Sequence, residues 1–416
     1  MSTRRKFLFL VVLVIGSLFL AEGGYRLVLL LSGKGYDASG TAAEIEDVAR
    51  SLSGPAWMPA EVEGRARGRV LHPFHGYEVR GIFDEASAEA LQDAEEGVLR
   101  VMVVGGSVAR ALVATSSASV LRAAEEASSP GGRRLRLINL AHAGFKQPQQ
   151  VMVVAHLLGR GARPDLVLNI DGVNEVALGL TNHHRGADPS YPALNQWAPL
   201  ARRRGVIDEE PTLVVAARAL EESAQGMASL SARLRLSWSA VLGRAVLSRM
   251  TRIRSEWVAL SDRYEELLAD TRDSELTGRE VPGRKQDGVL EAIVREWIES
   301  SVSLQALCAS RGILYLHVLQ PTLHDEGSKP LTPDEKLHGE ARESWIEGVR
   351  EGYPRLRAAG PGLVERGVDF RDLSLIFRDV TEPVYVDSCH LDVHGNEIFG
   401  REVGRAVAEV LHGLRD

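Results

Sequence analysis

The sequence contains few of the residues and motifs that mark several common protein classes. It has only two cysteines, Cys308 and Cys389, among 416 residues. It is therefore not a disulfide scaffold, although one bridge between the two is an open alternative, and neither cysteine lies in a metal-site pattern. The formal net charge is −7, which gives no electrostatic footprint for nucleic acid. The glycine pair at 105–106 has neither the G-x-G-x-x-G spacing nor the lysine of a phosphate-binding loop. We expect no nucleic acid, cofactor or metal partner.

The N-terminus lacks an uncharged run of full spanning length. Basic residues at 4–6 precede an uncharged run over 7–21, whereas a spanning helix needs about 20 residues. A cleaved signal peptide, an uncleaved anchor and a soluble apolar helix are the three alternatives. Phe19 would occupy the inner small-residue position of a cleavage site after Ala21, which favours an anchor over 1–32. The basic flank predicts a single-pass protein in the cell membrane, with its body on the periplasmic or extracellular side.

The remainder of the chain divides by pattern into four segments. Residues 33–95 are predicted as an irregular linker that packs on the main domain. The main domain is expected in two parts, 96–184 and 289–416. Between them, residues 185–288 are predicted as a helical insertion because the pattern there is amphipathic and rich in arginine.

Apolar runs alternate with helical patterns in both parts of the main domain. Strands are predicted at 98–106, 135–144, 164–175, 313–321 and 383–387, and helices at 108–128, 147–161, 289–311 and 393–412. Continuous apolar runs are typical of parallel strands buried on both faces. Strands joined by helices indicate a right-handed, doubly wound parallel sheet. The predicted fold class is therefore α/β, with three layers in the order α/β/α.

Four segments carry polar groups to the predicted carboxyl edge of this sheet, where doubly wound folds bind ligands. They are Gly105-Gly106-Ser107, "AHAGFKQ" around Gly144, "DGVNE" over Asp171–Glu175, and "DSCHLDVHGNE" over Asp387–Glu397. The first of these also begins a helix, so Ser107 is either a helix cap or a nucleophile.

The chemistry of these segments is complementary. A serine hydroxyl needs a base to become a nucleophile, and His390 supplies one for Ser107. Asp387, three residues earlier, orients the histidine and stabilises its charge. The tetrahedral intermediate needs hydrogen-bond donors, for which the N–H groups of Ser107 and Gly144 and the amide of Asn174 are suitable.

Several other polar residues have structural interpretations. His394 follows His390 by four residues, which suggests a metal site, but no further ligand is evident in the sequence. Asp392 is interpreted as the N-cap of the last helix. His72 and His75 are interpreted as loop or surface residues.

The order and spacing of the four segments resemble the SGNH hydrolases, also called the GDSL esterase/lipase family. The four blocks of that family carry Ser, Gly, Asn and His, which match Ser107, Gly144, Asn174 and His390, with Asp387 in the D-x-x-H of the last block. The likeness covers about 98–180 and 289–412, and is strongest to the membrane-anchored bacterial branch with a GGS first block. It implies a flavodoxin-like sheet.

Two positions depart from the pattern of the family. Gly106 stands where the first block has Asp, and Glu175 stands where G-x-N-D has Asp. Both lie beside matched residues, and neither removes a catalytic group.

The resemblance implies a membrane-tethered serine esterase that hydrolyses an acyl or acetyl ester through an acyl-serine, without a cofactor. Its substrate would be a small-molecule ester or an ester of an envelope glycan or lipid. An O-acyltransferase that uses the same acyl-enzyme and a non-catalytic glycan-binding module are the alternatives.

Overall fold

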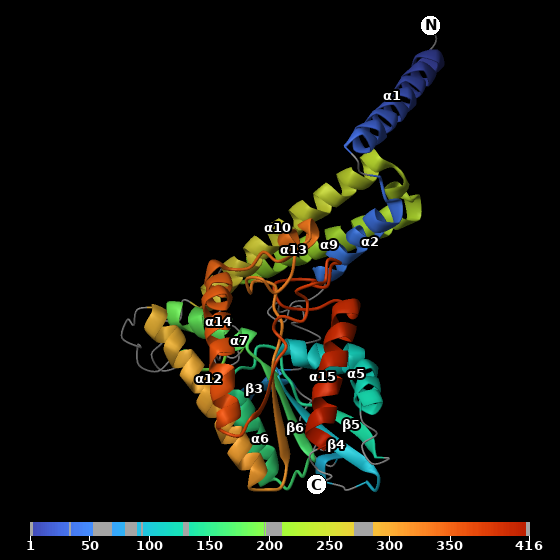
Figure 1. Ribbon diagram of the computed structural model, residues 1–416. Coiled ribbons are helices and arrows are strands. Elements are labelled where there is room, and N and C mark those ends of the chain that lie inside the picture. The colour runs from blue at the N-terminus through green and yellow to red at the C-terminus, as the bar shows by residue number, and fades with distance from the viewer. Residues whose placement is uncertain are drawn as a thin grey trace. The chain divides into compact units, whose positions relative to one another are not determined.

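The computed structural model describes residues 3–32, 35–52, 69–79, 90–92, 95–127, 133–194, 196, 210–269 and 286–412. The chain divides into two compact units (Figure 1). Unit 1 comprises Met1–Gly64 with Val206–Leu267, and unit 2 comprises Arg65–Gly205 with Leu268–Asp416. Each unit is thus built from two separate stretches of the chain.

Unit 2 contains a five-stranded parallel sheet. Its strands are β4 (Val98–Gly105), β5 (Arg134–Asn139), β6 (Leu166–Asp171), β7 (Leu314–Leu319) and β8 (Asp369–Asp372), in the spatial order β5-β4-β6-β7-β8. The predicted parallel sheet is therefore confirmed. The order reverses between β4 and β6, and such a switch point is where doubly wound sheets bind ligands, at the carboxyl ends of the strands.

Helices pack on both faces of the sheet (Figure 1). One face carries α5 (Ser107–Ala127) and α15 (Val393–His412); the other carries α6 (Gln149–Gly159), α7 (Val173–His184), α12 (Gln286–Ala309) and α14 (Glu343–Glu365). Strand β4 shows why both faces are covered. Val101 and Val103 belong to the core cluster with α5 and α15, whereas Met102 and Val104 belong to the other cluster. Alternate side chains point to opposite faces of a strand, so an apolar run needs a layer on each side.

Two elements at the sheet differ from the prediction. The fifth strand is β8, with the sequence "DFRD", and not 383–387. The latter segment forms only an isolated bridge between Tyr385 and Leu391. The "DGVNE" segment, predicted to end a strand and continue as a loop, does end β6 at Asp171, but its last three residues begin α7 and do not form a loop.

The stretch 33–95, predicted as irregular, contains regular structure. It includes α2 (Ala38–Ser51) and a hairpin of β2 (Arg69–His72) with β3 (Gly76–Val79). Helix α2 forms because Ile45 and Val48 recur at helical spacing and are buried in the core of unit 1. Residues 53–68, 80–89 and 93–94 lie outside the described residues.

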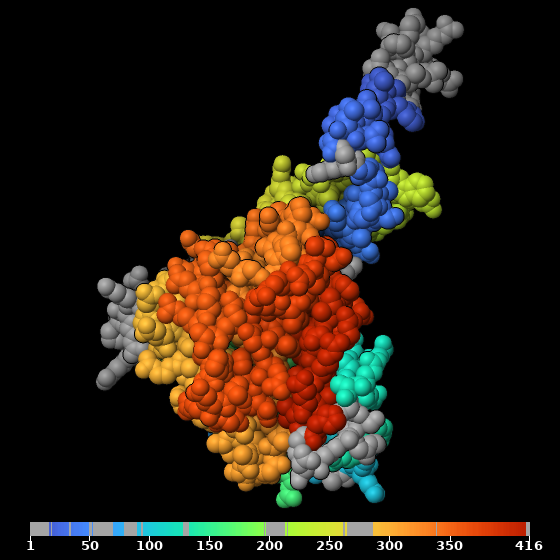
Figure 2. Space-filling model, in the orientation of Figure 1, coloured from blue at the N-terminus to red at the C-terminus, as the bar shows by residue number. Residues whose placement is uncertain are grey.

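Unit 1 consists of α1 (Thr3–Leu31), α2, α9 (Glu210–Leu234) and α10 (Ala240–Ala269). Its core contains Ala217 and Ala224 of α9 with Met250 and Trp257 of α10. Figure 2 shows the blue atoms of α2 against the yellow-green atoms of the α9 and α10 pair. A search of the described residues finds no helix that combines the length and apolarity needed to cross a membrane.

Candidate active site

Ser107 lies at the junction of β4 and α5. Gly105 ends the strand with φ +141°, and a Cβ there would fall 2.0 Å from the carbonyl oxygen of Ile170, so only glycine fits. Gly106 is the N-cap, because its carbonyl oxygen accepts the N–H of Arg110 at 3.1 Å. Ser107 is therefore the first helical residue. Its side chain does not act as the cap.

The hydroxyl of Ser107 is bonded to a histidine from the other end of the chain. His390 Nε2 lies 2.7 Å from Ser107 Oγ, across a separation of 283 residues. His390 Nδ1 lies 2.6 Å from Asp387 Oδ2. The structure thus brings together the three residues predicted to form a triad, in the order hydroxyl, imidazole and carboxylate.

A tight loop fixes Asp387 and His390 relative to each other. The loop is closed by the Tyr385–Leu391 bridge and by the Val386 N–H, which donates to the His390 carbonyl oxygen at 3.0 Å. Asp387 Oδ1 accepts the backbone N–H of His390 at 2.7 Å and that of Cys389 at 2.8 Å. The carboxylate is held on one oxygen and binds the imidazole with the other.

The same contacts determine the charges of the pair. The negative charge of Asp387 raises the pKa of His390 well above its usual value. Burial disfavours the charged form of Asp387, but the His390 charge and the hydrogen bonds outweigh it and hold the pKa of this carboxyl well below its usual value. Asp387 therefore stays ionised and favours the imidazolium that forms when His390 takes a proton.

Asn174 lies next to the serine turn. Its Nδ2 donates to the Phe145 carbonyl oxygen at 2.8 Å, and a Cβ on Gly106 would fall 2.4 Å from the same nitrogen. An amide nitrogen carries two hydrogens, so Asn174 has a second donor beyond the one that binds Phe145. The absence of a side chain at Gly106 is what lets this amide approach the residue preceding Ser107.

Gly144 occupies a turn that lies next to the serine turn. Its φ is +77°, and the Phe145 N–H that follows donates to the His142 carbonyl oxygen at 3.1 Å. Tyr77 holds the turn by donating its hydroxyl to the Ala143 carbonyl oxygen at 2.6 Å. Phe145 links this turn to the serine turn, because its carbonyl oxygen lies 3.5 Å from the position of a Gly106 Cβ.

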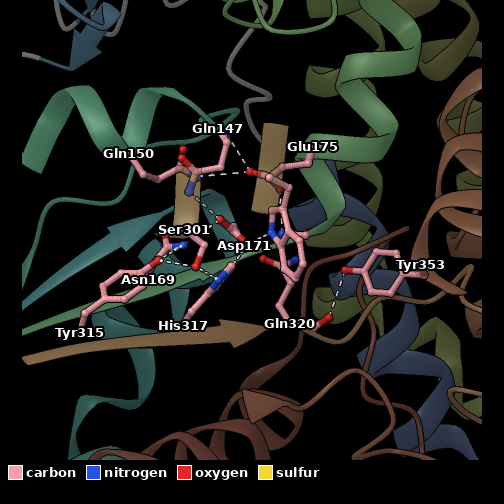
Figure 3. Close-up of polar contacts among 12 residues, drawn as sticks. Gln147, Gln150, Asn169, Asp171, Glu175, Ser301, Tyr315, His317, Gln320 and Tyr353 are labelled. Carbon is pink, nitrogen blue, oxygen red and sulfur yellow. Dashed lines mark hydrogen bonds and ion pairs between the residues drawn. The ribbon is translucent and has the colours of Figure 1, made fainter. Parts of the chain in front are cut away.

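Behind these turns lies a buried polar network that the sequence reasoning missed (Figure 3). Asp171 Oδ1 accepts hydrogen bonds from Trp297 Nε1 and from His317 Nε2, each at 2.7 Å. Asp171 Oδ2 accepts from Asn169 at 2.8 Å and from Gln147 Nε2 at 3.0 Å. Burial opposes the charge of Asp171, but His317 and these donors outweigh it and lower its pKa. The last residue of β6 is thereby fixed.

Glu175 joins the segment that carries Gly144 to the one that carries Asn174 (Figure 3). Its Oε2 accepts the N–H of Gly172 at 2.7 Å, and its Oε1 accepts the N–H of Gln147 at 2.9 Å. Burial, followed by the charge of Asp171, raises the pKa of Glu175 to about 8. The longer side chain at this departure from the family pattern spans both segments.

The other residues singled out in the sequence, which are Asp392, His394 and the two cysteines, lie outside the triad. Asp392 is confirmed as the cap of α15, because its Oδ1 accepts the N–H of Gly395 at 2.6 Å. His394 is exposed on the same helix. Cys308 and Cys389 are both buried and free.

His75 lies in the turn between β2 and β3, as its interpretation as a loop residue predicted, but it is buried and not at the surface. It stacks on His72 with 3.5 Å between ring centroids and 13° between planes. Together with Glu78 these histidines could hold a metal ion by proximity alone. However, an imidazole binds a metal ion in its own plane, and two nearly parallel stacked rings cannot share one ion. This geometry does not favour a metal centre.

Comparison with models of known protein families finds no match, and comparison with curated proteins finds none either.

Proposed function

We propose that the protein is a serine esterase with Ser107 as nucleophile, His390 as general base and Asp387 as the residue that orients the base. The observation that carries the proposal is the unbroken hydrogen-bond chain from Ser107 Oγ through both nitrogens of His390 to Asp387. The family resemblance and the doubly wound sheet, with the serine at its switch point, support the same function. The chain would then be a divergent SGNH hydrolase with a flavodoxin-like strand order.

The reaction proceeds in two halves. Ser107 Oγ attacks the ester carbonyl carbon while its proton passes to His390 Nε2. His390 then gives this proton to the leaving alkoxide, and the acyl group stays on Ser107. A water molecule attacks the acyl-serine, loses its proton to His390, and releases the acid as Ser107 regains the proton. Asp387 remains ionised throughout.

The oxyanion would be met by three donors: the N–H groups of Ser107 and Gly144 and the second N–H of Asn174. The Phe145 bond and the Glu175 contacts keep Asn174 and the Gly144 turn in place before substrate arrives. Such donors need no reorganisation as charge develops, which is why preorganisation lowers the barrier.

The protein would act beside a membrane, tethered by residues 1–32 with its body outside the cytoplasm. This part of the proposal rests on the basic residues before an uncharged run. The proximity of a membrane makes an acyl ester of an envelope glycan or lipid the expected substrate.

A fluorophosphonate probe followed by peptide mapping tests the nucleophile. Labelling at Ser107, lost in Ser107→Ala and retained in Ser301→Ala, is expected. A folded protein that takes no label would instead be a non-catalytic module. A panel of p-nitrophenyl esters, with and without glycan acceptors, separates the esterase from an O-acyltransferase. An acyltransferase should release p-nitrophenol slowly until an acceptor hydroxyl is added, and should then transfer the acyl group to that hydroxyl in place of water.

A further inference from the structure

The turn between α9 and α10 is fastened to α1 at one place. Glu22 accepts hydrogen bonds from the Ser239 hydroxyl at 2.6 Å and from the N–H of Ala240 at 2.8 Å. Arg26, one helical turn later, donates to the Trp238 carbonyl oxygen at 2.6 Å. Glu22 thus caps the first turn of α10 from another helix. We call residues 234–242 the hairpin tip.

The hairpin tip exposes large apolar side chains. Trp238 is 65% exposed and Leu234 is 61% exposed, and Leu242 is exposed as well. The guanidinium of Arg235 lies over the Trp238 ring, 5.2 Å from its centroid. Arg233 and Arg244 flank the tip and are exposed. Tryptophan, leucine and arginine together are the composition that favours a lipid–water interface.

An exposed leucine alone carries no meaning, because much of any protein surface is apolar. The tip differs because of its attachment. Glu22 directly follows the uncharged run 7–21, and the residues of α1 beyond Arg26 also expose apolar side chains, including Leu30 and Leu31. The tip therefore contacts α1 at the residues that directly follow the uncharged run.

We propose that the hairpin tip is a membrane-docking surface that inserts Leu234, Trp238 and Leu242 into the interface of a phospholipid bilayer. The inference rests on the proposed tether, because Glu22 and Arg26 place the tip beside the end of the uncharged run. Arg233, Arg235 and Arg244 meet anionic headgroups, which attract basic side chains near such a surface. Unit 1 is then fixed to the membrane at two points.

Depth measurements on the full chain test this docking. Trp238→Cys and, separately, Leu242→Cys are labelled with an environment-sensitive fluorophore, since the two native cysteines are buried. The labelled proteins are reconstituted into phosphatidylethanolamine–phosphatidylglycerol vesicles that carry a nitroxide near the headgroup. We expect strong quenching at both sites, and a loss of quenching in protein kept in nitroxide-free micelles.

Two further sites supply the matched controls. Val215→Cys labels a residue of α9 that is equally exposed but lies about 28 Å along the helix from Leu234, and it should stay unquenched. Leu20→Cys reports on the tether itself. Quenching at Leu20 without quenching at Trp238 and Leu242 overturns the docking while the tether holds. Absence of quenching at Leu20, Trp238 and Leu242 overturns both the tether and the docking. Quenching at Trp238 and Leu242 alone supports docking without the tether.

Discussion

Unit 2 contains two hydrogen-bonded arrays made of the same three residue types. The first is Ser107–His390–Asp387. The second is Ser301–His317–Asp171, in which Ser301 Oγ lies 2.8 Å from His317 Nδ1 and His317 Nε2 lies 2.7 Å from Asp171. The first array is open to solvent, with 35% of the His390 side chain exposed, whereas His317 is 0% exposed.

The difference shows that a triad is defined by access and orientation and not by residue types. In the open array Ser107 is bonded to Nε2 and can meet a substrate. In the buried array the serine is bonded to Nδ1 and also lies 3.3 Å from the Tyr315 hydroxyl, inside the core. Its remaining partners fix the end of β6, from which α7 and Asn174 follow. On the proposed function, the open array would perform the chemistry and the buried one would hold the oxyanion donors in place.

The sharpest test exchanges the two serines for alanine. Ser107→Ala should lower kcat by about 10³-fold or more, because the nucleophile is gone, while thermal unfolding changes little. Ser301→Ala should leave kcat within a few-fold but reduce the free energy of unfolding by about 1–3 kcal/mol, since buried partners lose a hydrogen bond. Ester hydrolysis and urea unfolding measure the two. Full activity in a folded Ser107→Ala protein would show that the open array is not catalytic.

Substitution of the two asparagines near the arrays should likewise affect different properties, one the catalytic rate and the other the stability. Asn174→Ala should lower kcat by about 10²–10³ with little change in KM, because it removes an oxyanion donor. Asn169→Ala, which removes a donor to Asp171, should chiefly reduce stability. Steady-state kinetics and thermal melts compare them. An unchanged kcat in Asn174→Ala would assign this amide to structure.

The pH profile should respond to only one of the two aspartates. General-base catalysis needs neutral His390, whose pKa the charge of Asp387 raises, so kcat/KM should climb with pH through a limb above 6.5. Asp387→Asn removes that charge, so the limb should move to lower pH while the maximum falls. Asp171→Asn should leave the limb in place. A limb that moves with Asp171 and not with Asp387 would reverse the assignment.

The last prediction concerns Glu175 and the pH dependence of stability, with no effect on the catalytic groups themselves. Its pKa is about 8 in the folded protein against 4.5 ordinarily, so the folded state retains a proton that the unfolded chain loses between these values. The stability from this proton is complete below pH 4.5 and is lost as pH rises to 8. The Tm of the wild type should therefore fall relative to Glu175→Gln between pH 5 and pH 8. Parallel Tm curves would show that Glu175 is ionised across this range.

The sequence reasoning succeeded where pattern and chemistry coincide. The parallel strands β4, β6 and β7 are composed mostly of apolar residues, and the residues of the open array follow from the spacing of Ser107 and the D-x-x-H segment. The sequence reasoning failed where an element is buried on all sides and therefore shows no alternation of polar and apolar residues. Helix α7 is buried on nearly every side, so it has no polar face for periodicity to detect.

The other misses have physical causes as well. Strand β8 has only Phe370 buried among four residues, so it carries no apolar run. "PVYVD" has the composition of a strand but is used as a single bridge. The buried array joins Asp171 to a histidine 146 residues away, and no local pattern pairs them.

The distance in sequence between Ser107 and His390 has a consequence for synthesis. The two residues are 283 positions apart, and at about 5–20 residues per second the ribosome adds His390 roughly a quarter of a minute to a minute after Ser107. During that interval Ser107 lacks the base that the proposed mechanism requires. On the proposed mechanism, hydrolysis could begin only after His390 has been made, and a product truncated before that residue would carry Ser107 without its base.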